Sequence, residues 1–110
     1  MSVVCFKSDK MGMGADDLGA ILIQGFINKV KEMSHKPKTF IFYNSAVKLV
    51  AGGSPVLDSL QEIHQSGVTF LVCGTCSDFF KVKDDIQVGT ISNMHEIVST
   101  LTSEPHIIYP

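Results

Sequence analysis

Short apolar runs alternate with amphipathic stretches along the chain, and this alternation predicts strands separated by helices. Most runs are apolar throughout, not only at every second position, which is typical of strands buried on both faces of a parallel sheet. The predicted strands cover residues 3–6, 39–43, 68–72, a short segment around 87–88, and 106–109. The sequence therefore predicts an α/β three-layer sandwich with a mostly parallel, five-stranded sheet.

The first predicted helix begins near Asp16 or Asp17, either of which could cap it. Its apolar positions follow a three-and-four spacing that predicts one buried face. These positions are Leu18, Ile21, Leu22, Gly25, Phe26, Val30 and Met33.

The other helices are predicted from their end signals. Residues 44–50 are predicted to be a short helical segment. Ser54 as N-cap, Pro55 at the first helical position and Gly67 as C-cap delimit the next helix. A short helix over 74–82 is expected to turn Phe79, Phe80 and Val82 inward. Before the last helix, Asn93 and Glu96 resemble a capping box, and its apolar stripe is Met94, Ile97, Val98 and Leu101.

Length and charge narrow the functional classes. The 110 residues fit a single domain spanning residues 1–110. The net charge is −2, with nine lysines and no arginine, so the chain lacks the basic footprint of proteins that bind nucleic acid or anionic membranes. No apolar run approaches the roughly 20 residues that span a bilayer, and the amino-terminal residues do not resemble a signal peptide. The sequence thus predicts a cytoplasmic protein with reduced thiols and no disulfide framework.

The segment Cys73-Gly74-Thr75-Cys76 is the most informative motif. It lies where a predicted strand ends and a helix begins, a place where backbone N–H groups stabilise a thiolate. A thiolate can accept a sulfane sulfur as a persulfide, and a neighbouring thiol can resolve it. Two inert structural thiols are the alternative. Zinc is disfavoured because no second ligand pair follows, and the motif of thioredoxin-like redox proteins usually follows the first strand instead.

Ligands of parallel α/β proteins bind beyond the carboxyl ends of the strands, which directs attention to residues 8–14, 44–54 and 73–78. Gly12 and Gly14 give an incomplete nucleotide-binding fingerprint, because Asp17 stands where a third glycine belongs. Asn44 could donate a hydrogen bond from its side-chain amide or simply cap the next segment, and Lys48 could lower a thiol pKa or simply be solvated. Cys5 is predicted to be a core residue.

Several short motifs follow one another in a fixed order. They are KSDKMGMG at 7–14 followed by Leu18-Gly19, FYNSAVKL at 42–49, GGSPVL at 52–57, GV at 67–68, CGTC at 73–76, VG at 88–89 and SNM at 92–94. Together these motifs resemble the DsrE/DsrF-like family, most closely the DsrE-type domain of YedF proteins. The resemblance implies a flavodoxin- or Rossmann-like topology, frequent homo-oligomers and participation in sulfur relay. One position departs from the pattern: many relatives have a glycine where this chain has Lys81.

The resemblance places the persulfide acceptor at Cys73 and the resolving thiol at Cys76. It further suggests a TusA-like sulfur carrier as a partner on another polypeptide, and a link to either sulfur or selenium. The predicted substrate- or partner-binding residues are Met11, Gly12, Gly14, Asn44, Ser45, Lys48, Gly74 and Thr75, and neither a metal nor a cofactor is expected. The predicted function is that of a sulfur carrier or sulfurtransferase-type subunit. A non-catalytic module that binds a small ligand or a protein is the alternative.

Overall fold

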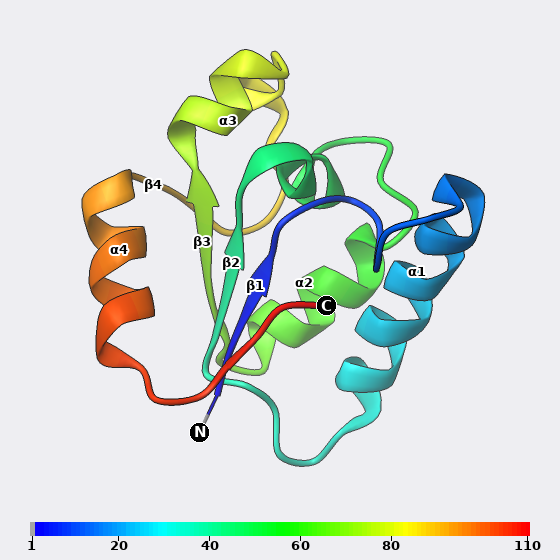
Figure 1. The fold of residues 1–110 in the computed structure, drawn as a ribbon, viewed down its shortest axis with the longest axis horizontal. Helices are drawn as coiled ribbons and strands as arrows, with labels where there is room; N and C mark the ends of the chain where they lie inside the picture. The colour runs from blue at the N-terminus through cyan, green and yellow to red at the C-terminus, as the bar shows by residue number, and fades with distance from the viewer. Residues whose placement is uncertain (1) are drawn as a thin grey trace.

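Five parallel strands form one central sheet in the computed structural model, which describes residues 2–110 (Figure 1). In sheet order the strands are β4, β3, β2, β1 and β5. Their bounds are Val3–Phe6 for β1, Thr39–Phe42 for β2, Thr69–Cys73 for β3, Thr90–Ser92 for β4 and Ile107–Ile108 for β5. Every neighbouring pair is parallel, so the predicted parallel α/β sheet is confirmed.

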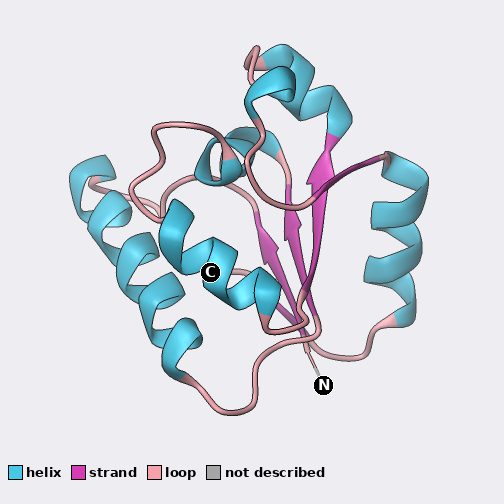
Figure 2. Ribbon diagram, turned by 180° about the vertical axis from the view of Figure 1, so that it is seen from behind, coloured by secondary structure: helices cyan, strands magenta, loops and turns pink. Residues whose placement is uncertain are grey.

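The helices cover both faces of the sheet. Helices α1 (Asp16–Glu32) and α2 (Leu57–Gln65) pack on one face, and α4 (Met94–Ser103) packs on the other (Figures 1 and 2). The 3₁₀ helix η1 (Asn44–Val50), the short helix α3 (Gly74–Phe79) and the 3₁₀ turn η2 (Lys83–Asp85) lie beyond the carboxyl ends of the strands. The predicted three-layer arrangement is therefore correct. Within residues 2–110, no helix combines the length and apolar character that crossing a membrane requires.

Aromatic rings fill the core between the sheet and the pair α1 and α2. Phe6 stacks on Phe42 with 5.0 Å between ring centroids, and Phe40 stacks on Phe70 at 5.1 Å. These residues are paired across neighbouring strands in the same register, so the strands bring the rings together. All four side chains are buried, so their packing holds α1 and α2 against the sheet.

The buried face of α1 differs from the one predicted. The helix buries Gly19, Ile23, Ile27 and Val30. Leu18, Ile21, Leu22 and Met33, predicted to be buried, are instead 45–66% exposed. Apolar residues occupy most of the circumference of this helix, so their spacing could not indicate which side packs on the sheet. The consequence is an apolar surface on α1 that faces away from the sheet.

The fourth strand begins three residues later than the segment predicted around Gln87 and Val88. The Gln87 N–H donates to the Val50 carbonyl, and Ile86 forms an isolated antiparallel bridge with Ala51. These contacts bind residues 86–87 to the end of η1 and keep them out of the sheet. Gly89, with φ +95°, then turns the chain into β4.

The helix ends agree with the prediction only in part. Ala15, not an aspartate, is the N-cap of α1, and Asp16 and Asp17 occupy its first turn. Helix α2 begins at Leu57 with Val56 as its N-cap, and the Ser54 hydroxyl accepts the Val56 N–H in the preceding turn. Ser66 is the C-cap of α2, and Gly67, predicted to be the C-cap, follows it at φ +112°.

One of the two hydrogen bonds of the predicted capping box at α4 forms. The Asn93 side chain accepts the Glu96 N–H at 2.9 Å, which confirms the cap. The Glu96 carboxylate accepts the Ser92 hydroxyl instead of the N-cap N–H, so the reciprocal half of the box is replaced by a bond to the last residue of β4. The helix is thereby tied to the strand before it.

Candidate functional site

The two cysteines of the motif lie at the junction of β3 and α3. Cys73 is the last residue of β3 and the N-cap of α3, and its sulfur accepts the Cys76 N–H at 3.5 Å. The Ser77 hydroxyl donates to the Cys73 carbonyl at 2.8 Å, which holds the first turn of α3 against the strand. The motif therefore lies at the carboxyl end of β3, as the sequence predicts, with Cys73 inside the strand and Cys76 beyond it.

Only one of these two thiols reaches the surface. Cys73 is 2% exposed, although a persulfide acceptor at the end of a strand is expected to point out over the edge of the sheet, where a partner can reach it. The chain turns directly from β3 into α3, and the turn covers the Cys73 side chain. Cys76, one helical turn later, is partly exposed. A reagent in solution therefore meets Cys76 first.

The Cys76 sulfur accepts a hydrogen bond from the Asn44 backbone N–H at 3.1 Å. Asn44 opens η1 with φ +52°, a conformation that asparagine tolerates better than most residues. The Asn44 side chain accepts the Ser45 N–H at 2.8 Å. The expectation was that the Asn44 side-chain amide would donate; the donor to the thiol is instead its backbone N–H.

A hollow of about 250 Å³ opens above Cys76. Asn44, Thr75, Phe79 and Phe80 complete its lining. Phe79 is 78% exposed, contrary to the inward position predicted for it, and its ring meets that of Phe80 edge-on at 5.1 Å. The accessible thiol therefore lies in a small opening with aromatic walls.

Sequence reasoning missed the aromatic walls because it assigned both rings to the core. Phe79 and Phe80 are adjacent, and neighbouring residues of a helix point about 100° apart, so one interior cannot take both. Two consecutive aromatic residues, three and four positions after Cys76, were the available signal for a lining role.

Lys48 lies behind the wall formed by Phe80. Its ammonium nitrogen is 4.5 Å from the centre of the Phe80 ring, within the range of a cation–π contact. Lys48 does not line the hollow above Cys76, and it belongs to a second hollow described below. Of the two roles considered for Lys48, the structure favours the solvated one: its side chain is exposed and contacts the Phe80 ring.

The remaining predicted binding residues support the site or lie away from it. The Ser45 hydroxyl accepts the Asp9 N–H at 3.2 Å and joins the first loop to η1. Gly74 is buried, and a Cβ there would lie 3.1 Å from the Ser92 carbonyl, so its role is close packing. Met11, Gly12 and Gly14 lie in the first loop and do not line the hollow above Cys76.

The third cysteine lies apart from the motif. Cys5 is fully buried in β1, which confirms its prediction as a core residue, and burial raises the pKa of its thiol. Among residues 2–110, no group of three or more histidine, cysteine, aspartate or glutamate side chains is placed to hold a metal ion.

The exposed thiol is less acidic than an ordinary cysteine. Burial raises the pKa of Cys76, and its hydrogen bond with the Cys73 side chain contributes to the increase. The hydrogen bond from the Asn44 N–H favours the thiolate and opposes both effects without overcoming them. The Cys76 thiolate forms only at a pH above the usual range.

The rate of alkylation of Cys76 tests whether the pKa of its thiol is raised. Because the reactive species is the thiolate, a raised pKa moves the midpoint of the rate-against-pH curve above about 8.5, the value of a free cysteine. The measurement is the rate of iodoacetamide labelling at Cys76, followed by peptide mass spectrometry between neutral and alkaline pH. The labelling rate of the Cys76→Ser variant gives the background from the two buried thiols. A midpoint at or below that of free cysteine contradicts the expectation.

A comparison with protein families matches residues 25–110 to the DsrE/DsrF-like family. The match spans well over half of the chain and includes the cysteine motif. The chain belongs to the DsrE/DsrF-like family.

Lys81 stands in this DsrE/DsrF-like chain where the resemblance leads us to expect a glycine. Its φ is +59°, in the left-handed region that favours glycine. The backbone of the turn after α3 therefore has the conformation expected of a glycine, although the residue is lysine.

Three solved structures share the fold of this DsrE/DsrF-like chain, and all are below 25% identity. The ychN protein from E. coli has 14% identity and a TM-score of 0.73, with 99% of this chain and 98% of that one covered. MTH1491 from Methanobacterium thermoautotrophicum, a protein of unknown function, has 18% identity and a TM-score of 0.71, with 99% and 97% covered. BT1422 from Bacteroides thetaiotaomicron, also of unknown function, has 21% identity and a TM-score of 0.68, with 99% and 94% covered. No curated protein matches the chain.

Proposed function

We propose that this DsrE/DsrF-like protein is a sulfur carrier that receives a sulfane sulfur on Cys76. The observation that carries the proposal is the partly exposed Cys76 thiol, which has a backbone N–H donor on its sulfur and the buried thiol of Cys73 beside it. This arrangement exchanges the roles that the family resemblance implies for the two cysteines. Cys76 is the acceptor, and Cys73 is the resolving thiol.

Loading is a thiol exchange at the donor's outer sulfur. The Cys76 thiolate attacks the terminal sulfur of a donor persulfide, the donor's S–S bond breaks, and the donor leaves as a thiolate that takes up a proton. Cys76 then carries the persulfide. The Asn44 N–H, which already points at the Cys76 sulfur, stabilises negative charge on it during the exchange.

Cys73 supplies a second, slower reaction. Its thiolate attacks the inner sulfur of the Cys76 persulfide, a Cys73–Cys76 disulfide forms, and hydrosulfide leaves with the electron pair of the broken bond. The two cysteines are oxidised while the sulfane sulfur is reduced to sulfide. A cellular dithiol must then reduce the disulfide before the next cycle, so the proposal places the protein in a reducing compartment such as the cytoplasm.

A partner protein must approach the hollow above Cys76 to exchange sulfur. The exposed ring of Phe79 at the rim supplies an apolar contact for that partner. A TusA-like carrier on a separate polypeptide is the partner that the family resemblance suggests. Asn44 and Thr75 line the same opening and offer polar contacts to the incoming sulfur.

Mass spectrometry after exposure to a persulfide donor tests the proposal. We expect one added sulfur on the intact protein and its location at Cys76 after proteolysis under non-reducing conditions. Addition at Cys5 alone, or no addition at a pH where the Cys76 thiolate has formed, contradicts the proposal. Selenium is tested in the same way with a selenium donor.

We also propose that the chain forms a homo-oligomer through the apolar face of α1, defined by Leu18, Ile21, Leu22 and Met33. These four exposed side chains, joined by Met11 in the first loop, form a larger apolar surface than single exposed residues do. A contact through the apolar residues Met11, Met13, Phe79 and Phe80 near the carboxyl edge of the sheet is the alternative that the sequence suggests. Without arginine, either contact is mainly apolar and depends weakly on salt.

Ile21→Glu is expected to convert the oligomer to a monomer, because Ile21 is 66% exposed on the apolar face and a charge there must be desolvated in the contact. Light scattering at micromolar concentration, at low and high salt, measures the change. Met13→Glu is the matched control, since Met13 is fully exposed in the first loop. A parent protein that is monomeric at both salt concentrations contradicts the proposal. If Met13→Glu gives a monomer and Ile21→Glu does not, the contact lies at the first loop and not on α1.

A further inference from the structure

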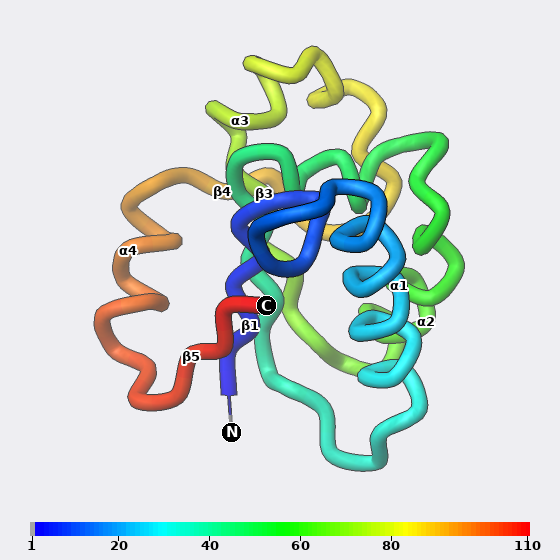
Figure 3. The backbone as a smooth tube through the Cα atoms, turned by 45° about the vertical axis from the view of Figure 1, so that its right-hand side comes forward, coloured from blue at the N-terminus to red at the C-terminus, as the bar shows by residue number. Residues whose placement is uncertain are grey.

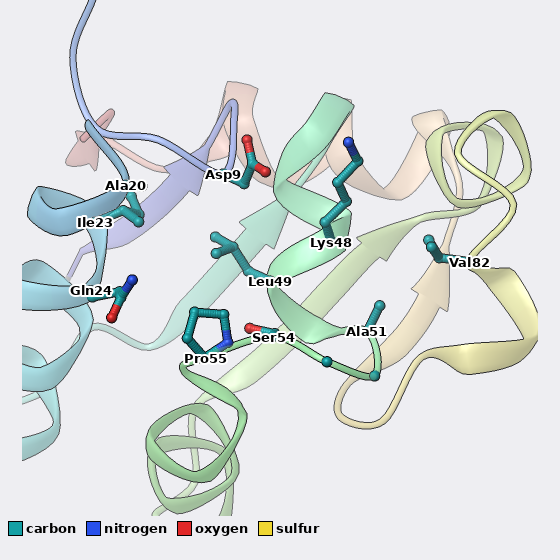
Figure 4. A pocket seen from close by; sticks show the side chains of 12 residues that line it. Asp9, Ala20, Ile23, Gln24, Lys48, Leu49, Ala51, Ser54, Pro55 and Val82 are labelled. Carbon is teal, nitrogen blue, oxygen red and sulfur yellow. The ribbon is translucent and has the colours of Figure 1, made fainter. Parts of the chain in front are cut away.

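A second hollow, of about 430 Å³, lies beside η1 (Figure 4), and Cys76 is not part of its lining. The lining comes from the first loop, helix α1, the end of η1, the loop between η1 and α2, and Val82 after α3. This volume and a mainly apolar lining with few polar groups are typical of sites for small organic molecules. It also lies beyond the carboxyl ends of the strands, where ligands of parallel α/β proteins bind.

The interior of the second hollow is apolar. Ile23 from α1, Leu49 from η1 and Pro55 form its walls (Figure 4). Gly52 and Gly53 leave one side without side chains, and a Cβ on Gly53 would meet no atom within 4 Å. Gly52 is held in place by its N–H bond to the Asp85 carbonyl. A short apolar side chain of a ligand therefore finds a preformed space.

Two opposite charges stand at one rim of this space. Figure 4 shows the Asp9 carboxylate and the Lys48 ammonium above Leu49, on separate segments of the chain. The Asp9 backbone is fixed by its N–H bond to the Ser45 hydroxyl. Its carboxylate pairs with the partly exposed side chain of Lys10, and the Lys48 ammonium contacts the Phe80 ring. A partly exposed ion pair and an exposed cation–π contact each contribute little, so a ligand can displace them.

We propose that the second hollow binds a free α-amino acid with an unbranched apolar or thioether side chain. The ligand's ammonium group pairs with Asp9, its carboxylate pairs with Lys48, and its side chain enters the space between Ile23 and Leu49. A nucleotide is a poor fit, because Asp9 repels phosphate and the chain has no arginine to hold one. This site goes beyond the proposed function, since its lining includes neither Cys73 nor Cys76.

Calorimetry with four probes tests the site. The probes are L-methionine, L-norleucine, decarboxylated methionine and methionine whose amino group is replaced by hydrogen. None carries a transferable sulfane sulfur, so the outcome is independent of sulfur loading. We expect methionine and norleucine to bind, and each analogue that lacks a charge to bind at least about tenfold more weakly, the effect of one lost charged hydrogen bond.

Two variants assign the two charges. Asp9→Asn is expected to lower the affinity for methionine and to leave the affinity for the probe without an amino group unchanged. Lys48→Gln is expected to lower the affinity for methionine and to leave the affinity for the probe without a carboxylate unchanged. Circular dichroism checks that each variant is folded, and Cys76→Ser is the matched control that should bind methionine like the parent. Absence of binding by both amino acids overturns the proposal. It is also overturned by equal binding of all four probes, or by loss of binding in Cys76→Ser.

Discussion

Cys76→Ser is expected to abolish sulfur loading, whereas Cys73→Ser is expected to load normally and to hold its persulfide longer. The reason is access: Cys76 opens into the hollow lined by Phe79 and Phe80, and Cys73 is 2% exposed. A donor therefore reaches Cys76 alone. Without Cys73, no neighbouring thiol is left to attack the persulfide and release sulfide, so its lifetime grows.

Time-resolved peptide mass spectrometry after a pulse of persulfide donor measures both effects. The two variants control for each other, because each removes one sulfur and replaces it with a hydroxyl of similar shape. Loading that survives in Cys76→Ser and disappears in Cys73→Ser restores the roles expected from the sequence, and it requires α3 to move away from the strand. If both variants load like the parent, the motif does not carry the sulfur.

Gly89→Ala is expected to lower the free energy of unfolding by about 2–5 kcal/mol, a sum of left-handed backbone strain and overpacking. Gly89 has φ +95°, and a Cβ there would lie 2.9 Å from the Phe70 Cβ and 3.1 Å from a Val72 methyl. Both neighbours are buried in β3, so neither can move aside freely. Such a loss is a large fraction of the stability of a small domain.

Gly53→Ala is the matched control for this prediction. Gly53 has a similar φ of +85°, but a Cβ there would meet nothing within 4 Å. It should therefore carry only the backbone strain, about 1–2 kcal/mol. Urea unfolding of both variants measures the difference. Equal losses would mean that β3 accommodates the added methyl group and that packing around Gly89 is not tight.

The sheet could be predicted from the sequence because its strands are buried on both faces. Runs such as residues 39–43 and 68–72 have few polar residues and many β-branched or aromatic ones, so they fit little else. The predicted fourth strand was placed too early because Val88 is also apolar and buried. Val88 lies in the loop before Gly89, not in the strand. Burial alone does not distinguish a strand from a loop that crosses the core.

The candidate site could be located from the sequence, but its access could not. The spacing of Cys73 and Cys76 predicts two neighbouring thiols at the end of a strand. Which thiol is exposed depends on how tightly the chain turns after β3, and that depends on Gly74 packing against β4. The same holds for α1: only the sheet decides that Ile23 is buried and Ile21 is exposed. Both misses concern orientation, which arises from contacts between distant segments.

The position of β5 has a consequence for how the protein folds as it is synthesised. Strands β2, β3 and β4 are added to the sheet one after another on the same side of β1, so each can pair soon after it leaves the ribosome. β5 pairs with the opposite edge of β1, and the Val3 N–H donates to the His106 carbonyl across more than a hundred residues of sequence (Figure 3). Until residues 106–108 are made, that edge of β1 offers unpaired backbone groups to any extended chain nearby. The nascent protein therefore exposes this edge until its sheet is completed, and a chaperone that covers the edge of β1 would protect it during that time.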